Sequence, residues 1–306
     1  MIVNMEQTTS SKIGKKLQEL REDGGVVALG RVLTLIIETN SEQLEQAIEA
    51  ANGASRLHPS RIIVLVSNLE QGDKSSRLDA EIRIDGDAGA SEVVVIRAFG
   101  EANSNTESMV TGLLLPDAPV VAWWPSDCKA NPSKNPIGGI ATRRITDAGA
   151  QKDKAGFLKE LAKNYLPGDG DMSWTRITLW RSQLAALFDN NVDREVTAIR
   201  VLGSKTSPSV RLLASWLSMG LGVASEIVHK LSGIEIEGIA GVEISFDKGE
   251  IAIIRSGDVA NISQTGSPDS SILLPRRSDL DCLMEDMRFL GEDEVYGAVL
   301  KNEFSQ

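Results

Sequence analysis

The side chains best suited to nucleophilic, acid–base or metal chemistry are few in this chain and lie far apart. The sequence holds two histidines, His58 and His229, and two cysteines, Cys128 and Cys282. None of the four has a partner at the short spacing that zinc sites use, so a metal site would need ligands distant in the sequence. We expect a structural or solvent-exposed role for both histidines. We also expect unreactive cysteines, although Lys129 beside Cys128 favours its thiolate.

Sequence motifs that carry common catalytic or cofactor-binding chemistry are missing. There is no G-x-x-x-x-G-K-[ST] phosphate loop, no G-x-G-x-x-G after a predicted strand, no G-x-S-x-G and no H-E-x-x-H. Catalytic sites also assemble from distant residues, so the missing motifs argue only against the common enzyme classes. We expect no catalytic residue, no metal and no cofactor.

Arginine and tryptophan are the remaining residues whose placement suggests a function, which is contact with another protein. Arg143 and Arg144 lie in a stretch expected to be a loop. Trp174 and Arg181 share one stripe of a predicted helix, whereas Trp180 lies on its inward face. Because Arg and Trp are enriched at protein interfaces, this stripe is expected to be exposed and to bind a partner.

Two other roles remain open for these arginines. They can pair within the chain with carboxylates such as Asp147 or Asp171. Arg143 and Arg144 can also hold a phosphate, since guanidinium groups bind phosphate oxygens in pairs.

The run LLLPDAPVVAWW, residues 113–124, ends in two of the five tryptophans of the chain. Its β-branched and aromatic residues predict a strand over 119–124. Neighbours along a strand point to opposite faces, so one of Trp123 and Trp124 enters the core. The other is either covered by a helix or exposed as an anchor for a partner. The candidates for a partner interface are therefore Trp123, Trp124, Arg143, Arg144, Trp174 and Arg181.

The first half of the sequence predicts a scaffold that begins with a βαβ unit. Residues 31–38 and 61–67 read as strands, and the second is apolar without alternation, as in a strand buried on both faces. A helix between them is expected to begin after Ser41 as N-cap and to end at Asn52-Gly53. The two strands should therefore pair in parallel.

Further strands extend this sheet. Residues 77–84 alternate between apolar and polar side chains, which favours an antiparallel or edge strand, and 92–99 form another. With 119–124, the sheet has about five strands. Ile13, Leu17 and Leu20 predict an amphipathic helix beside it, and 126–150 are expected to be mostly loop.

The second half predicts a smaller domain of the same class. Helices are expected near 157–165 and 174–188, and the polar run DNNVD at 189–193 is the expected linker. Beyond it we expect strand 196–202, a helix 209–219 capped by Ser207, a hairpin about 247–249 and a helix from Ser278. The predicted fold class is α/β (mixed α+β), with two domains, residues 1–190 and 191–306. Each is a mixed β-sheet with packed helices.

Composition limits the classes of partner. The chain has 306 residues and a net charge of −11, which disfavours nucleic acid and anionic membranes as general partners. The first residues lack the charged start and apolar run of a secretory signal, and no run approaches 18 apolar residues. We expect a cytoplasmic protein.

Six blocks in one order resemble a known family. They are LLLPDAPVVAWW (113–124), HPSRIIVLV (58–66), GDAGASEVVVIR (86–97), RRITDAG (143–149), DMSWTRITLWR (171–181) and SPSVRLLASWL (207–217). Together they resemble the glucose-6-phosphate dehydrogenase assembly protein family, OpcA, in its shorter actinobacterial type.

The resemblance implies a helper without chemistry of its own. It would bind glucose-6-phosphate dehydrogenase, the first enzyme of the oxidative pentose phosphate pathway, and raise its activity. Longer cyanobacterial relatives are linked to redox control, which would need reactive cysteines here. The alternative is a sugar-phosphate-binding enzyme or sensor that uses the strand ends of the first domain, where open α/β sheets place ligands.

Overall fold

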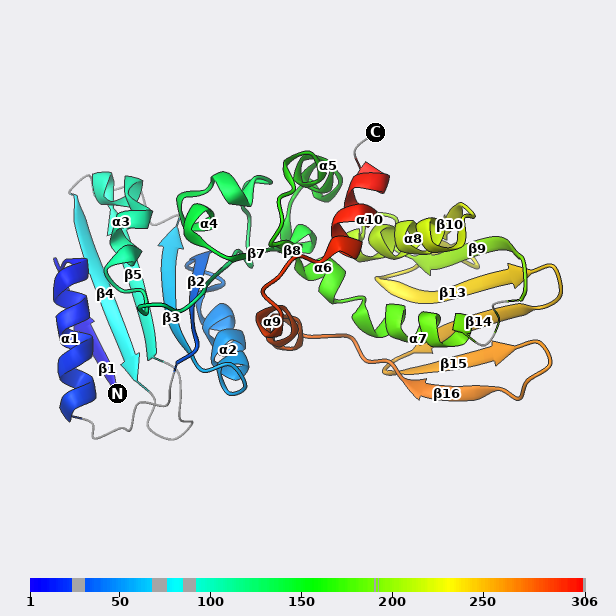
Figure 1. Cartoon of the computed structure of the whole chain (residues 1–306), viewed down its shortest axis with the longest axis horizontal. Helices are drawn as coiled ribbons and strands as arrows, with labels where there is room; N and C mark the ends of the chain where they lie inside the picture. The colour runs from blue at the N-terminus through cyan, green and yellow to red at the C-terminus, as the bar shows by residue number, and fades with distance from the viewer. Residues whose placement is uncertain (24–30, 68–75, 85–91, 190, 192, 305–306) are drawn as a thin grey trace. The chain divides into compact units, whose positions relative to one another are not determined.

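The computed structural model describes residues 1–23, 31–67, 76–84, 92–189, 191 and 193–304 (Figure 1). These residues form two compact units that exchange segments of chain. Unit 1 comprises Met1–Ala150, Leu166–Gly170 and Asp279–Glu292, and unit 2 comprises Gln151–Tyr165, Asp171–Ser278 and Asp293–Gln306. Each unit is built on one large β-sheet with helices packed against it, so the predicted mixed α/β fold is confirmed.

The sheet of unit 1 has the strand order β1-β4-β5-β3-β2-β6-β7-β8. Neighbours from β5 to β7 pair in parallel, whereas β4 runs antiparallel to both β5 and β1. The strands are β1 (Ile2–Met5), β2 (Leu33–Asn40), β3 (Ser60–Ser67), β4 (Arg77–Ile84), β5 (Glu92–Phe99), β6 (Val120–Trp123), β7 (Arg143–Thr146) and β8 (Asp169–Asp171).

The predicted βαβ unit is present. β2 and β3 pair in parallel from Leu33↔Ser60 to Asn40↔Ser67, and α2 (Leu44–Ser55) connects them. Both strands are almost wholly buried, because α2 packs on one face of the sheet and other helices cover the opposite face. Burial on two sides explains why their sequences show an apolar run instead of alternation.

The limits of α2 differ from the predicted ones. Gln43, not Ser41, is the N-cap, and the helix continues through Asn52-Gly53. The glycine lets α9 (Asp279–Arg288) pack against α2. A Cβ at residue 53 would lie 2.6 Å from Leu280 Cδ1, so Gly53 allows a close approach between two helices rather than ending one.

The face of the sheet opposite α2 is covered by α1 (Ser10–Asp23), α3 (Thr106–Thr111) and α4 (Pro136–Ile140). Ile13, Leu17 and Leu20 of α1 are buried here, as predicted. On β4 the alternation holds: Leu78, Ala80 and Ile82 point into this core, and their neighbours along the strand are half-buried. The position of Gly24-Gly25, predicted to follow α1, lies outside the described residues.

The prediction of about five strands was too low, since the described residues of unit 1 form a sheet of eight. β1, β7 and β8 contain only three or four residues each, too few to show a hydrophobic period. The prediction that 126–150 are mostly loop was also wrong for part of the segment. It contains α4, strand β7 and two 3₁₀ turns, Pro132–Lys134 and Ala148–Ala150.

Unit 2 contains a six-stranded sheet in the order β10-β9-β13-β14-β15-β16. The predicted hairpin joins β13 to β14, with Gly249 at φ +93° in its turn. The strands are β9 (Val196–Gly203), β10 (Ser225–Val228), β13 (Ile239–Phe246), β14 (Glu250–Ser256), β15 (Val259–Gln264) and β16 (Ser270–Leu273). The short strands β11 (Lys230–Leu231) and β12 (Ile234–Glu235) pair separately.

The two faces of this sheet differ. Val201, Ile244 and Ile253 on the inner face are at most 1% exposed. The inner face packs against α7 (Thr178–Asp189) and α8 (Pro208–Leu221). Residues on the outer face, such as Ile254 and Asn261, are exposed. An antiparallel sheet with one solvated face is common, so this face alone does not identify a binding site.

Three further helices complete unit 2: α5 (Lys154–Asn164), α6 (Met172–Thr175) and α10 (Glu294–Phe304). The single helix predicted over 174–188 is in fact two, because α6 ends at Thr175 and α7 begins at Thr178. The sequence did not predict α10. Ser207 caps α8 as predicted, and its Oγ accepts the Val210 amide hydrogen at 3.5 Å.

The compact units do not have the limits of the predicted domains, residues 1–190 and 191–306. Helices α5 and α6 pack against α8 and so belong with the second sheet, although they precede residue 190. Conversely, α9 packs against α2 in unit 1. Independent folding of 1–190 and 191–306 remains a prediction.

Candidate functional site

Trp123 is the last residue of β6 and Trp124 follows it in unit 1, and both residues are buried, at 1% and 3% exposure. Helix α4 covers Trp124: a Cβ at Gly138 would lie 3.3 Å from the ring. Trp124 Nε1 donates to Glu38 Oε2 at 2.6 Å, and Asn135 Nδ2 donates to the same oxygen at 2.9 Å. Of the two roles predicted for the second ring, burial beneath a helix is the one observed.

Arg143 lies in strand β7 and not in a loop, so that prediction was wrong. Its side chain is 5% exposed and its Nη2 lies 2.5 Å from Asp286 Oδ1 of α9. Arg143 Nη1 also donates to the carbonyl of Gly291 at 3.3 Å. The arginine thus holds the segment 279–292 against β7.

Arg144, its neighbour in β7, joins the strand to a different segment. Its Nε donates to Asp169 Oδ1, and its Nη1 donates to the carbonyl of Ala141 at 2.9 Å. Asp169 is 1% exposed, so burial raises the pKa of its carboxyl, and the hydrogen bond from Arg144 opposes that rise. Both arginines thus pair with carboxylates, which was one of the predicted roles, but the partners are Asp286 for Arg143 and Asp169 for Arg144, where the prediction named Asp147 or Asp171.

Trp174 is 2% exposed, so the expectation of an exposed stripe was wrong for this residue. Its Nε1 donates to Asp293 Oδ2 at 2.7 Å, and its ring centroid lies 5.6 Å from that of Tyr296. Arg181, which is half-buried, stacks over the ring at 3.7 Å and donates to Thr178 Oγ1 at 3.1 Å. Trp180 is also buried, as predicted.

The six candidate residues do not form one continuous surface. Trp123, Trp124, Arg143 and Arg144 belong to unit 1, whereas Trp174 and Arg181 belong to unit 2. Five of the six are less than 10% exposed, and Arg181 alone among them is half-buried. Their contacts support the core of each unit, and a role in partner binding stays a prediction.

A pocket of about 700 Å³ lies at the carboxyl ends of β2, β3 and β6 in unit 1. β2 lies between β3, which follows it in the sequence, and β6, which comes later in the chain. Open α/β sheets bind ligands at such a point, beyond the carboxyl ends of the strands. Glu38 in its wall already accepts hydrogen bonds from Trp124 and Asn135. Asp127, Lys129 and Lys134 also line the pocket, so its wall carries both signs of charge and does not by itself select an anion.

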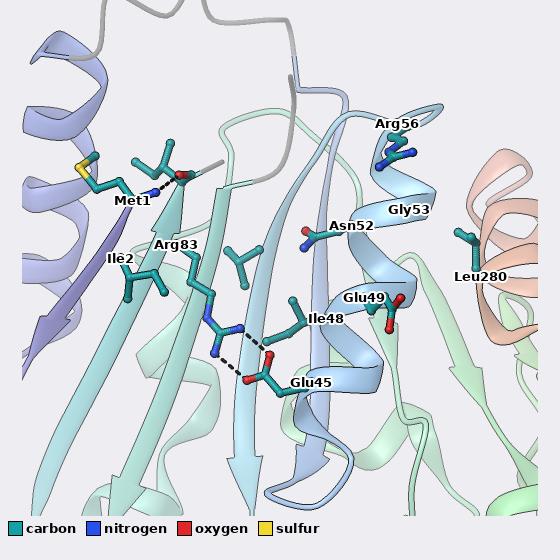
Figure 2. Close-up of a pocket in the computed structure, with 12 residues that line it drawn as sticks. Met1, Ile2, Glu45, Ile48, Glu49, Asn52, Gly53, Arg56, Arg83 and Leu280 are labelled. Atoms are coloured by element: carbon teal, nitrogen blue, oxygen red, sulfur yellow. Dashed lines mark hydrogen bonds and ion pairs between the residues drawn. The ribbon is translucent and has the colours of Figure 1, made fainter. Parts of the chain in front are cut away.

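A second pocket of unit 1, of about 760 Å³, lies between α2 and the strands β1 and β4 (Figure 2). Arg83 and Glu45 face each other across it in a two-pronged ion pair, with both N–O distances 2.7 Å. The hydrogen bond from Arg83 lowers the pKa of Glu45, so this carboxylate stays ionised near neutral pH. Such a group is poorly suited to act as a general acid.

The cysteines and histidines are placed separately. Cys282 is buried in α9, and Cys128 is partly exposed in the wall of the strand-end pocket, and neither forms a disulfide. His58 and His229 are both half-buried. Within the described ranges, no three His, Cys, Asp or Glu side chains are grouped to hold a metal ion. No helix in the described part of the chain is long and apolar enough to span a membrane.

The outer face of the second sheet is not among the surfaces predicted from the sequence. Ile254, Val259 and Leu273 are exposed there, Leu273 to 78%. Their strands are adjacent: Ile254 pairs with Asn261, and Val259 pairs with Leu273. The register puts the three on one face, since Val259 and Asn261 are two residues apart. The sequence contains these apolar residues within its strands, but it does not show which face of the sheet helices cover.

Comparison with protein families places both parts of the chain. Residues 51–163 match the model described as the glucose-6-phosphate dehydrogenase subunit N-terminal domain. Residues 167–300 match the model of the C-terminal domain of the same subunit. None of the curated proteins compared with the chain matches it.

Solved structures show only a distant likeness. UDP-N-acetylglucosamine 3-dehydrogenase GnnA from Acidithiobacillus ferrooxidans has 8% identity and a TM-score of 0.43, over 89% of this chain and 97% of that one. An oxidoreductase from Sinorhizobium meliloti has 12% identity and a TM-score of 0.45, over 84% of this chain and 88% of that one. An oxidoreductase from Thermotoga maritima has 11% identity and a TM-score of 0.45, over 90% of this chain and 95% of that one. These values are too low to bear on the activity of this chain.

The two family models follow each other in the expected order and cover most of the sequence, including all six sequence blocks in full. The chain belongs to the OpcA family of glucose-6-phosphate dehydrogenase assembly proteins.

Proposed function

We propose that this protein is a non-catalytic helper that binds glucose-6-phosphate dehydrogenase and raises its activity in the oxidative pentose phosphate pathway. The observation that carries the proposal is the match of residues 51–163 and 167–300 to the two domains of a subunit of that enzyme. The actinobacterial type and a cytoplasmic location belong to the same proposal and rest on the sequence features described above.

A helper without chemistry acts only by binding one state of its partner more tightly than another. Coupling energies of about 1–3 kcal/mol are typical of allosteric effects and change a ligand's affinity roughly 5–150-fold. We therefore propose that the helper prefers the assembled or substrate-competent state of the dehydrogenase. The dehydrogenase then binds its substrate more tightly or turns over faster at the same substrate concentration.

The outer face of the second sheet is the surface we propose for the dehydrogenase. Ile254, Val259 and Leu273 lie exposed on adjacent strands, and Arg200 pairs with Glu243 on the same face at 2.6 Å. An apolar centre beside charged groups is the usual arrangement of an interface. The six residues predicted from the sequence remain part of the proposal. Being mostly buried, they would act by holding the binding surface in shape, with Arg181 the one best placed for direct contact.

Steady-state kinetics of the dehydrogenase with increasing helper test the activation. We expect a saturable fall in KM or rise in kcat, within the range given above. The helper alone, with glucose 6-phosphate and NADP, is the control, and turnover by it would favour the alternative of a sugar-phosphate enzyme. Unchanged kinetics at saturating helper, with binding shown by size-exclusion chromatography, would contradict activation.

Substitutions on the sheet test the surface. Leu273→Asp and Ile254→Asp should each weaken dehydrogenase binding by at least about thirtyfold, which corresponds to the 2 kcal/mol of a hot-spot residue. Ile234→Asp is the matched control, because Ile234 is 74% exposed on β12, which is not a strand of this sheet. Affinity is measured by titration calorimetry, and the melting temperature checks the fold. Normal binding by both sheet variants would show that the dehydrogenase contacts another surface. Arg181→Ala would then be the next variant to test.

A further inference from the structure

Unit 2 contains a pocket of about 310 Å³ whose wall carries four arginines. Arg176 comes from the junction of α6 and α7, Arg255 from β14, and Arg276 and Arg277 from the segment that follows β16. No acidic side chain is among the described residues that line it. We propose that this pocket binds the phosphate group of a small metabolite.

Two of the arginines, Arg255 and Arg276, form no salt bridge within the described residues. Arg255 donates to the carbonyl of Ile239, and Arg276 Nη2 donates to the carbonyl of Glu237 at 3.4 Å. Burial and the charge of Arg276 lower the pKa of Arg255, and only Asp258, an exposed carboxylate, opposes this effect. Neutral carbonyls do not balance two guanidinium charges, so an anion in the pocket would relieve their repulsion.

A glycine leaves space for the Arg276 side chain in the wall of the pocket. Gly238 has φ +63°, and a Cβ at that position would lie 2.8 Å from Arg276 Nη1. Any other residue would therefore be strained and would displace the guanidinium group. A hydrogen bond holds Arg277 in place, since its Nη1 donates to the carbonyl of Thr175 at 2.7 Å.

The amino end of α8, a helix of 14 residues, also lines the pocket through Ser207 and Ser209. The Ser209 hydroxyl already donates to the carbonyl of Ser173 at 2.8 Å, which leaves Ser207 Oγ as the hydroxyl donor for a ligand. The positive end of a helix dipole favours an anion there and adds to the effect of the arginines. Trp180 and Ile177 provide an apolar wall for the rest of a ligand.

The geometry favours phosphate over a single carboxylate as the anion. A phosphate group presents three acceptor oxygens and up to two negative charges. A planar guanidinium group can donate two parallel hydrogen bonds to two of those oxygens. The volume is at the low end of the range for small-molecule sites, so the pocket fits a phosphorylated metabolite and not a macromolecule.

Titration of the full-length protein, without the dehydrogenase, tests this site. Inorganic phosphate, glucose 6-phosphate and glucose are compared by calorimetry in chloride buffer of equal ionic strength. Phosphate and glucose 6-phosphate should bind one to one with a dissociation constant of about 1 mM or lower, and glucose should not bind. Tighter binding of glucose 6-phosphate than of inorganic phosphate would identify a phosphorylated metabolite as the natural ligand.

Variants locate the site. Arg276→Gln should weaken phosphate binding at least about tenfold, and Arg276→Lys should recover part of it, because lysine keeps the charge but lacks the fork. Arg276 is exposed, so neither change should alter the melting temperature without ligand. Lys248→Gln removes an equal charge from an exposed position of the same unit outside the pocket and should leave binding within about twofold of wild type. No phosphate binding, or equal weakening in Arg276→Gln and Lys248→Gln, would overturn the proposal.

Discussion

Replacing Arg144 by alanine is expected to lower the free energy of unfolding by about 3–5 kcal/mol, the usual result of removing one partner from a buried ion pair. Asp169, 1% exposed, would lose the Arg144 Nε–H donor that opposes the rise of its pKa, which leaves a buried carboxyl without its partner. The carbonyl of Ala141 would also lose its hydrogen-bond donor. Urea denaturation followed by circular dichroism gives the free energy directly.

Two further variants separate this effect from general loss of charge. Arg200→Ala breaks an exposed ion pair with Glu243 and should cost no more than about 1 kcal/mol. The double variant Arg144→Met/Asp169→Leu should recover much of the stability, because paired apolar side chains do not leave a charge buried. If Arg144→Ala is as stable as Arg200→Ala but no longer binds the dehydrogenase, then Arg144 is an interface residue after all.

Replacing Trp174 by alanine should cost a similar 3–5 kcal/mol, the range for truncating a buried tryptophan. The change removes the ring packed against Tyr296 and the surface on which Arg181 stacks at 3.7 Å. It also leaves the Asp293 carboxylate without the indole N–H at 2.7 Å. Thermal and urea unfolding of the variant measure the loss.

Trp174→Phe is the matched control, since it keeps an aromatic ring for Tyr296 and Arg181 and loses mainly the hydrogen bond to Asp293. We expect it to lie between wild type and Trp174→Ala. Arg181→Ala, at a half-buried position, should cost about 0.5–2 kcal/mol through the lost cation–π contact. Full stability of Trp174→Ala together with weaker dehydrogenase binding would show that Trp174 contacts the partner.

Elements with a long hydrophobic period could be predicted from the sequence. β2, α2, β3, β4 and β5 were located to within two or three residues, because each contains eight or more residues with a clear apolar pattern. The parallel pairing of β2 and β3 followed from the length of the connection between them. Similarly, the turn Asp247-Lys248-Gly249 predicted the hairpin β13–β14.

β7 could not be predicted, because its four residues include two arginines and their burial depends on distant partners. Asp169 and Asp286 lie 25 and 143 residues away from Arg144 and Arg143. Local sequence carries no signal for such pairs. It therefore suggested an exposed loop, where the structure has a buried strand held by two ion pairs.

The tryptophans show the same limit. That Trp123 and Trp124 point to opposite faces follows from the strand geometry alone. Whether the second face is covered depends on α4, whose five residues Pro136–Ile140 include two glycines and no helical period. A single helix over 174–188 predicts an outward direction for Trp174, and the break between α6 and α7 changes that direction.

Because unit 1 includes a segment from near the end of the chain, it cannot be completed until most of the chain has been synthesised. Unit 1 needs Asp279–Glu292, which leaves the ribosome more than a hundred residues after Ala150. At translation rates of about 5–20 residues per second, that delay is on the order of 10 s. During it Arg143 lacks Asp286, and Gly53 lacks the cover of Leu280. A ribosome that stalls in this interval presents an unfinished first unit, which is the kind of chain that chaperones and proteases act on.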